Sequence, residues 1–430
     1  MNQTTTRFRS KATIVLLGAA MAWPALAADN TSEVQALRQL VEALQKKMEA
    51  MESASAARTA TPAQAAVAAP AAPAVTNTPG GFKFYGSLDS GVETVNNVGA
   101  NKSSVTRVPT TTGSGPSALG LDVAKDVGSG YRAIGKAEMG IQLDNGASGQ
   151  ASRLFGRQAY VGMETPIGSI TVGRQYNMLF WGLMAGDLLG PNIYGLGSID
   201  PYIPNARTDN SVAWRGKFGR TSLGAAYSFG RDTLSTVPQS GSCAGEDASN
   251  SSACRSWSLL ARFDAKSFGL AAALDQQSGG TGGTAGFMNG VAPVAFASSS
   301  DTDTRTTLNG FYKIDAIKLG AGWMGREVKT SATTIKQDTT WVQVDYAASP
   351  QWVYTGGVFH VANDTQKRSA KLFALKAVYN FDAQLSTYLT LGHVLNTNGA
   401  YSVSGGGAGT GLTVAGSDQT GFMVGMRYRY

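Results

Sequence analysis

Two cysteines are the residues of this 430-residue chain best suited to covalent chemistry. Cys243 and Cys254 are its only cysteines, and both lie in a stretch rich in Gly, Ser and Asn. In an exported protein an even pair of cysteines most simply forms a disulfide, which here would close one loop. A metal site built on this pair is the less favoured alternative, because no histidine lies nearby.

Groups suited to catalysis are scarce. The two histidines, His360 and His393, each stand beside apolar residues in a segment of alternating polarity. No serine lies in a G-x-S-x-G motif, and the glycine-rich tract 279–284 lacks the Lys-Ser/Thr of a phosphate-binding loop. The cations are scattered and no basic helix occurs, so nucleic acid is not an expected partner. The sequence therefore predicts no enzyme, no cofactor and no metal site.

The composition favours a β-sheet that faces lipid on one side. Glycine contributes 53 residues, and charged residues make up 15% of the chain, against about 25% in soluble globular proteins. Low charge with high glycine fits a cytosolic α/β enzyme poorly. No run of 18 apolar residues follows the N-terminal segment, so membrane-spanning helices are excluded. The remaining class is an outer-membrane-type barrel with polar residues inside.

The first 80 residues divide into three segments. Residues 1–27 have the basic start, short apolar core and Ala25-Leu26-Ala27 site of a cleaved signal peptide. Residues 28–52 carry apolar side chains at heptad spacing, which predicts a short coiled-coil helix, with a solvated amphipathic helix or a peptidoglycan-contacting stalk as alternatives. Residues 53–80 form an Ala/Pro/Thr tract, which predicts a semi-rigid linker. The coiled-coil seam consists of Val34, Leu37, Val41, Leu44, Met48 and Met51.

Residues 81–430 consist of short segments in which polar and apolar residues alternate with the period of a β-strand. The connections between these segments alternate between short and long. Seven short and eight long connections predict an all-β fold, a sixteen-stranded antiparallel transmembrane barrel with both ends in the periplasm. The expected short connections are 126–130, 165–168, 216–219, 264–267, 315–316, 347–351 and 380–384. The expected long ones are 96–116, 144–152, 176–207, 230–255, 276–303, 328–338, 362–368 and 396–418.

Three runs in the barrel segment carry a family resemblance. Residues 157–163 (RQAYVGM) and 168–175 (GSITVGRQ) are spaced like two successive strands, residues 207–212 (RTDNSV) follow the third long connection, and Tyr430 is a terminal aromatic residue. In this order they resemble Gram-negative trimeric general-diffusion porins, in which the last residue is usually phenylalanine. The N-terminal heptads are similar to the periplasmic extension of a minority of these porins.

The resemblance implies a homotrimer of barrels in the outer membrane, each narrowed by an inward-folded third loop. It also implies contact with outer-membrane lipid and lipopolysaccharide, and assembly by the barrel-assembly machinery through the C-terminal strand. Carboxylates on the third loop would face cations across the constriction, and such opposed charges bias ion selectivity. The acidic candidates are Asp187 and Asp200, and the basic candidates are Arg132, Lys136, Arg174 and Arg157.

The placement of Arg174 is a conflict within these expectations. Strict alternation places it with Ile170 and Val172 on the lipid face, whereas the resemblance places it in the lumen. A bulge at Gly173 would reconcile the two, and a position near the lipid headgroups is the alternative. Arg157 has the same ambiguity.

The predicted function is a passive, water-filled channel for small hydrophilic solutes and ions. The formal net charge is +7, residues 1–27 hold three cations and no acid, and residues 28–80 hold four cations and five acids. The barrel segment therefore keeps a charge of +5, which favours weak anion selectivity. A porin selective for small carboxylates, or a mainly structural barrel with a stalk that reaches peptidoglycan, are the alternatives.

Overall fold

The computed structural model describes Lys46 and residues 81–233, 241–288, 293–404 and 412–430. The expected signal peptide, coiled-coil seam and linker lie outside the described residues and stay predictions. Within the described ranges, no helix is long and apolar enough to cross a membrane.

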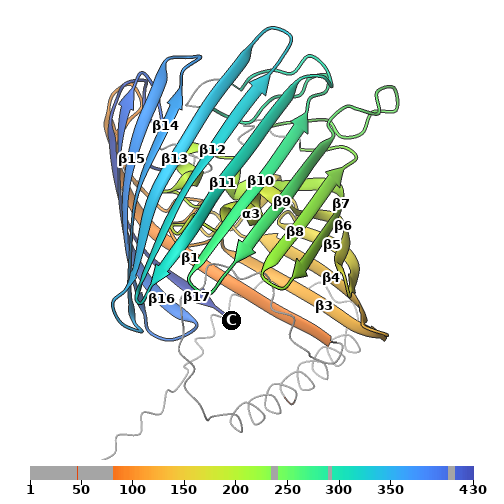
Figure 1. The fold of residues 1–430 in the computed structure, drawn as a ribbon. Helices are drawn as coiled ribbons and strands as arrows, with labels where there is room; N and C mark the ends of the chain where they lie inside the picture. The colour runs from red at the N-terminus through yellow and green to blue at the C-terminus, as the bar shows by residue number, and fades with distance from the viewer. Residues whose placement is uncertain (1–45, 47–80, 234–240, 289–292, 405–411) are drawn as a thin grey trace, which may run out of the picture. The chain divides into compact units, whose positions relative to one another are not determined.

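The described strands form one closed antiparallel sheet (Figure 1). β1 (Gly81–Val98) pairs on one side with β17 (Gln419–Arg429), and this pairing closes the barrel. On its other side β1 pairs with both β2 (Ser103–Arg107) and β3 (Ala118–Gly128), which are two parts of the second wall strand. The wall therefore has sixteen strand positions, and the predicted barrel is confirmed.

The remaining strands each pair with their neighbours in sequence. They are β4 (Tyr131–Gly140), β5 (Gln158–Thr165), β6 (Gly168–Tyr176), β7 (Arg207–Phe218), β8 (Thr221–Ser228), β9 (Ser256–Asp264), β10 (Phe268–Ser278), β11 (Thr302–Ile314), β12 (Ile317–Lys329), β13 (Thr334–Ala347), β14 (Trp352–Asn363), β15 (Arg368–Asn380) and β16 (Leu385–Thr397).

All seven short connections lie where the alternation predicts them, but three of the eight long ones are wrong. In the first, 96–116, residues 99–102 form a short hairpin between β1 and β2, and β2 itself lies within the expected loop. The other two are short hairpins. Residues 330–333 join β12 to β13, and residues 364–367 join β14 to β15. These strands continue beyond the expected loop bounds because their ends alternate buried and exposed polar residues, as in Lys336–Asp338 of β13. A strand with polar side chains on both faces is easily mistaken for a loop.

The barrel is apolar outside and polar inside. Leu308, Val342 and Leu375 are between 59% and 65% exposed on the outer face. The largest fully buried side chain is Arg305, on the inner face of β11. This inverted polarity suits a wall that contacts lipid on one side and encloses polar groups on the other.

Residues 177–206, named loop 3 here, fold into the interior (Figure 1). They contain α3 (Met178–Leu183), α4 (Leu196–Ile199) and the 3-10 helix η1 (Ile203–Asn205), and a further short element, α2 (Gly149–Ser152), lies in the preceding long connection. Asn177 begins α3 by accepting a hydrogen bond from the Phe180 amide at 3.1 Å. The apolar residues of loop 3 join the main hydrophobic cluster of the interior, as expected for a loop too apolar for open solvent.

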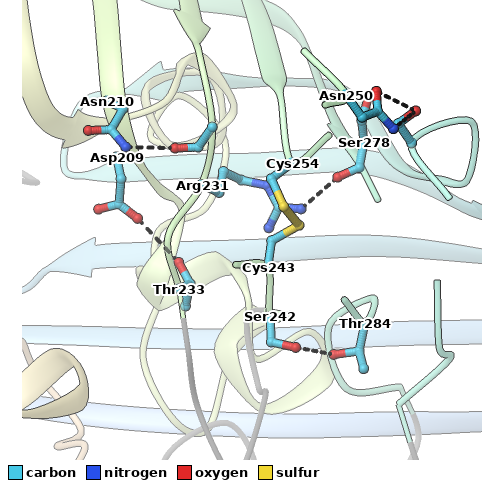
Figure 2. Close-up of a disulfide and its surroundings, with 12 residues drawn as sticks. Asp209, Asn210, Arg231, Thr233, Ser242, Cys243, Asn250, Cys254, Ser278 and Thr284 are labelled. Atoms are coloured by element: carbon cyan, nitrogen blue, oxygen red, sulfur yellow. Dashed lines mark hydrogen bonds between the residues drawn. A yellow bond between two sulfur atoms is a disulfide. The ribbon is translucent and has the colours of Figure 1, made fainter. Parts of the chain in front are cut away.

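The predicted disulfide joins Cys243 to Cys254 within the one connection between β8 and β9 (Figure 2). Hydrogen bonds link this loop to the connection between β10 and β11. The Cys254 amide donates to the Gly279 carbonyl at 2.8 Å. Ser242 and Thr284 exchange two backbone hydrogen bonds of 3.0 Å each. A β-carbon added at Gly280 would lie 3.0 Å from the Cys254 sulfur, so this position needs a small residue. The disulfide therefore closes one loop, as expected, and backbone hydrogen bonds hold that loop against its neighbour.

Reducing the disulfide will loosen the loop that it closes. The cysteines are 11 residues apart, and a closed loop of this size stabilises the folded state by roughly 2–3 kcal/mol in the chain-entropy account. We expect a glutamate-specific protease to cleave at the exposed Glu246 faster after reduction, with mass spectrometry of the fragments as the measurement. Equal cleavage rates with and without reductant would contradict this role.

Candidate functional site

The interior holds a cavity of about 990 Å³ with a strongly cationic lining. Loop 3, the strand walls and residues 110–118 all contribute to it. Twelve lining residues are Lys or Arg and four are Asp or Glu. The cations are Lys83, Lys136, Arg153, Arg157, Arg174, Arg207, Arg215, Arg231, Lys318, Lys376, Arg427 and Arg429. The carboxylates are Asp122, Glu138, Asp187 and Asp345.

Hydrogen bonds from wall side chains hold the backbone of loop 3 against the barrel. The Gly186 amide donates to Asn309 at 2.8 Å, and the Trp341 indole donates to the Gly186 carbonyl at 3.0 Å. Gln343 accepts from the amides of Leu188 and Leu189 at 2.9 and 2.7 Å. A β-carbon at Gly186 would lie 2.7 Å from the carbonyl oxygen of Gly310, so glycine permits this contact between two backbones.

Asp200 secures the second half of loop 3 to the wall. Its carboxylate lies 2.7 Å from Nε of Arg305 and 3.7 Å from Nη1 of Arg326. Asp303 completes the network, at 3.2 Å from Arg305 and 2.8 Å from Arg326. These four side chains are at most 1% exposed. The structure therefore places Asp200 in a buried ion-pair network and not in the cavity lining, since two wall guanidinium groups compete with water for its carboxylate.

Asp187, the other predicted acidic residue, does line the cavity. Its Oδ1 accepts a hydrogen bond of 3.0 Å from Nε2 of Gln343. The side chain is 2% exposed, and within the described ranges no cation lies within 4.0 Å of it. Burial raises the pKa of Asp187 to about 6, an effect that the hydrogen bond from Gln343 only partly offsets.

Arg157 and Lys136 line the cavity, each beside a carboxylate. Arg157 lies 2.7 Å from Glu138 and donates a second hydrogen bond of 2.7 Å to Tyr176. The Lys136 ammonium group lies 2.6 Å from Asp122 and covers the ring of Tyr85 at 4.5 Å from its centroid. These two predicted cations belong to nearly neutral pairs, so they order the lining more than they charge it.

A bulge turns Arg174 into the cavity. The register between β6 and β7 shifts between Gly173 and Gln175, and Gly173 has a φ of +130°. The expected bulge at Gly173 is thus present, and it explains why strict alternation places this arginine on the wrong face. Arg174 and Arg153 share the carboxylate of Asp209, and Arg153 also lies 3.1 Å from Asp232.

Arg132, the fourth predicted basic residue, is not part of the cavity lining. It stands next to the first residue of β4, beside the short turn that follows β3. Its guanidinium lies 3.6 Å from Asp126 and 3.9 Å from Glu164. Alternate residues of a strand share a face, so Arg132 lies on the same face as Lys136. Its height along the strand does not follow from this alternation, and a residue at the turn lies at the rim of the barrel.

Eight of the lining cations have no carboxylate within 4.0 Å among the described residues. Some of them contact aromatic rings, as for Arg215 over the ring of Trp181 at 4.3 Å and Lys318 over the ring of Phe311 at 4.5 Å. The four cations that the sequence analysis proposed all lie beside carboxylates, and these eight were not among them. The alternation of polar and apolar residues already places Lys318, Arg427 and Arg429 on the inner face of their strands. Arg231 lies outside any strand, so alternation says nothing about it. The eight are Lys83, Arg207, Arg215, Arg231, Lys318, Lys376, Arg427 and Arg429.

Solved structures with a similar fold are outer-membrane proteins. An anion-selective porin from Comamonas acidovorans is 20% identical, with a TM-score of 0.67, covering 82% of this chain and 100% of that chain. The in-vitro folded trimer form of OmpT from Vibrio cholerae is 18% identical, with a TM-score of 0.59 and coverages of 82% and 100%. Salmonella typhi OmpF, solved with daunomycin, is 14% identical, with a TM-score of 0.54 and coverages of 83% and 99%. At these identities the likeness concerns the fold.

Comparisons by sequence give the family. An outer membrane porin protein of Bordetella pertussis is 32% identical over 114 residues, which are 26% of this chain and 30% of that porin. The chain thus matches about a third of the length of this curated relative. A family model described as Gram-negative porin matches residues 53–400, well over half of the chain. The chain therefore belongs to the Gram-negative porin family.

Proposed function

We propose that the chain forms a water-filled outer-membrane channel through which small hydrophilic solutes and ions diffuse, with a preference for anions. The observation that carries this proposal is the lining of twelve cations and four carboxylates. Because cations outnumber carboxylates in the lining by twelve to four, the lumen keeps a positive potential that raises the local concentration of anions. The likeness in fold to an anion-selective porin agrees with this preference.

Planar-bilayer recording in a salt gradient tests the proposal. We expect discrete conductance steps and a reversal potential on the anion side. A potential on the cation side would leave the channel in place but contradict the charge argument. A folded barrel without conductance would contradict the diffusion channel itself.

The acidic side of the constriction in this proposal is Asp187, and the basic side includes Arg157, Arg174 and Lys136.

Asp187 makes the ion selectivity of the channel depend on pH. With its pKa raised to about 6, it is mostly ionised at pH 7 and mostly protonated at pH 5. Loss of one negative charge will raise the anion-to-cation permeability ratio by roughly twofold between these pH values, as judged from a screened charge about 10 Å from the path. The reversal potential measures this, and Asp187→Asn should reduce the shift.

The proposal includes a homotrimer that contacts lipid and lipopolysaccharide over the rest of its outer face. The outward face of β4 and β5 includes the small residues Ala133, Ala137 and Ala159, which suit contact between subunits. Trp352 and Tyr354 on β14 have aromatic side chains that suit a membrane interface. The mass of the detergent-solubilised protein, measured by light scattering, tests the trimer.

The same proposal places residues 28–80 in the periplasm and has the barrel assembled by the barrel-assembly machinery through β17.

Catalysis is not part of the proposed function. His360 is exposed on the outer face of β14, and His393 on β16 bonds Thr420 at 2.8 Å. Neither histidine lines the cavity. Absence of hydrolysis of model esters and lipids by the purified barrel is the expected result.

A further inference from the structure

The second wall strand is interrupted by a segment that leaves the wall. Residues 108–117, named the inner strap here, connect β2 to β3. Arg107, the last residue of β2, pairs with Glu93 of β1, and Ala118, the first residue of β3, pairs with Ser87 of β1. Only the five residues 88–92 of β1 therefore face a strap of ten residues. The strap has about twice the length that the wall requires, so it folds out of the sheet.

The inner strap folds toward the cavity. Thr110, Thr111, Ser114, Pro116 and Ser117 all line it. The hydroxyl of Ser117 bonds both the amide and the carbonyl of Asp89 at 2.9 Å, and so replaces part of the missing strand pairing. This anchoring makes the strap a fixed part of the interior.

Two glycines allow the strap to lie close to the wall and to a cation. A β-carbon at Gly113 would lie 3.0 Å from the ring of Tyr388. A β-carbon at Gly115 would lie 2.8 Å from three atoms of the Arg427 guanidinium. The strap also contacts loop 3, because Asn192 donates to the Ser114 carbonyl at 3.3 Å. The two inward-folded elements therefore meet.

Backbone carbonyls of the strap hold two of the unpaired cations. Lys376 donates to the Gly113 carbonyl at 3.4 Å, and Nη1 of Arg427 lies 3.5 Å from the Ser114 carbonyl. Arg427 also donates to the Ser87 hydroxyl at 3.0 Å. Neutral acceptors of this kind fix a cation in place without cancelling its charge. Lys376 and Arg427 are thus oriented and still available to attract an anion.

We propose that the inner strap is a second constriction beside loop 3, and that it presents Lys376 and Arg427 as a binding step for small anions. The proposal rests on the channel function proposed above and adds a second element and a specific cation pair to it. Anions that pass loop 3 interact with these two cations, and the strap limits the cross-section there.

Cysteine labelling tests the place of the strap in the conduction path. The two native cysteines are joined to each other, so a new cysteine is the one free thiol. After Ser114→Cys, reaction with the anionic reagent MTSES should lower single-channel conductance by roughly half, because the added sulfonate both fills the lumen and repels anions. Ser331→Cys, in the exposed hairpin 330–333, is the matched control and should leave conductance unchanged.

Two further variants test the constriction and the cation pair. Replacing residues 108–117 with five Gly and Ser residues, the length that β1 requires, should raise conductance by roughly twofold. Lys376→Gln with Arg427→Gln should lower the anion-to-cation permeability ratio by about fourfold at 0.1 M salt. If the shortened strap fails to fold, the labelling result and the cation pair still decide the proposal.

The outcomes separate this proposal from the channel function. A wild-type protein that conducts, with a Ser114→Cys variant that either does not react or reacts without a change in conductance, would overturn the inner strap as a constriction. Absence of conductance in the wild-type protein would instead overturn the channel function.

Discussion

Arg305→Met will destabilise the barrel and release loop 3. The substitution leaves Asp303 with Arg326 as its one cation, and Asp200 with the 3.7 Å contact to Arg326 and a 3.1 Å hydrogen bond from the Tyr202 amide. Because both carboxylates are fully buried, losing one partner of such a network costs on the order of 3–5 kcal/mol. We expect a lower unfolding temperature, measured by circular dichroism and by the heat-dependent shift in gel mobility. Single-channel recordings should also become noisier, since loop 3 loses its main charged anchor.

An exposed ion pair on a neighbouring strand pair provides the control. Lys336 lies 3.2 Å from Glu327, and both side chains are substantially exposed. Lys336→Met removes a surface pair, which contributes roughly 0–1 kcal/mol, so the unfolding temperature should barely change. Adding Asp200→Asn to Arg305→Met should restore part of the lost stability, because it removes one uncompensated buried charge. Equal unfolding temperatures for Arg305→Met and Lys336→Met would refute the anchoring role.

Neutralising three unpaired lumen cations will reduce or abolish the anion preference. Lys83, Lys318 and Arg429 line the cavity on three different strands and have no carboxylate within 4.0 Å among the described residues. Each charge removed should change the anion-to-cation permeability ratio by about twofold at 0.1 M salt. The triple glutamine variant should therefore shift that ratio by roughly eightfold, as read from the reversal potential in a salt gradient.

A paired cation supplies the contrast for this variant. Lys136→Gln together with Asp122→Asn removes one charge of each sign from a pair separated by 2.6 Å. The net lumen charge is unchanged, so the reversal potential should stay close to that of the wild-type protein. If this double variant and the triple variant gave the same shift, unpaired charge would not set the selectivity.

The strands were predictable because lipid and water impose opposite polarity on alternate side chains. The alternation along a strand assigns each residue to one of its two faces, and Lys136 and Arg132, four residues apart, share the inner face. It could not assign height along the strand, which is why Lys136 lines the cavity and Arg132 lies at the rim. Arg174 needed one more signal, the glycine that precedes it, to reveal the bulge.

The ion-pair network and the inner strap could not be predicted from the sequence. Asp200 and Arg305 are 105 residues apart, and only the folded barrel brings them together. The sequence around an acidic loop residue does not show whether its carboxylate faces water or a buried guanidinium. The strap was included in an expected external loop, because its Thr, Gly, Ser and Pro residues are typical of any surface loop. Its inward path depends on the wall that it meets.

The closing seam sets the order in which the barrel can form. Every wall pairing joins strands that are neighbours in sequence, except that between β1 and β17, where Tyr430 and Gly86 exchange two backbone hydrogen bonds. Hairpins can form early because their loop-closure entropy is small, whereas the seam joins the two ends of the barrel sequence and must form late. Until the last residue is in place, the chain is an open sheet with two unpaired edges, the form most prone to aggregate. Completion of the ring therefore turns an aggregation-prone intermediate into a sheet without edges.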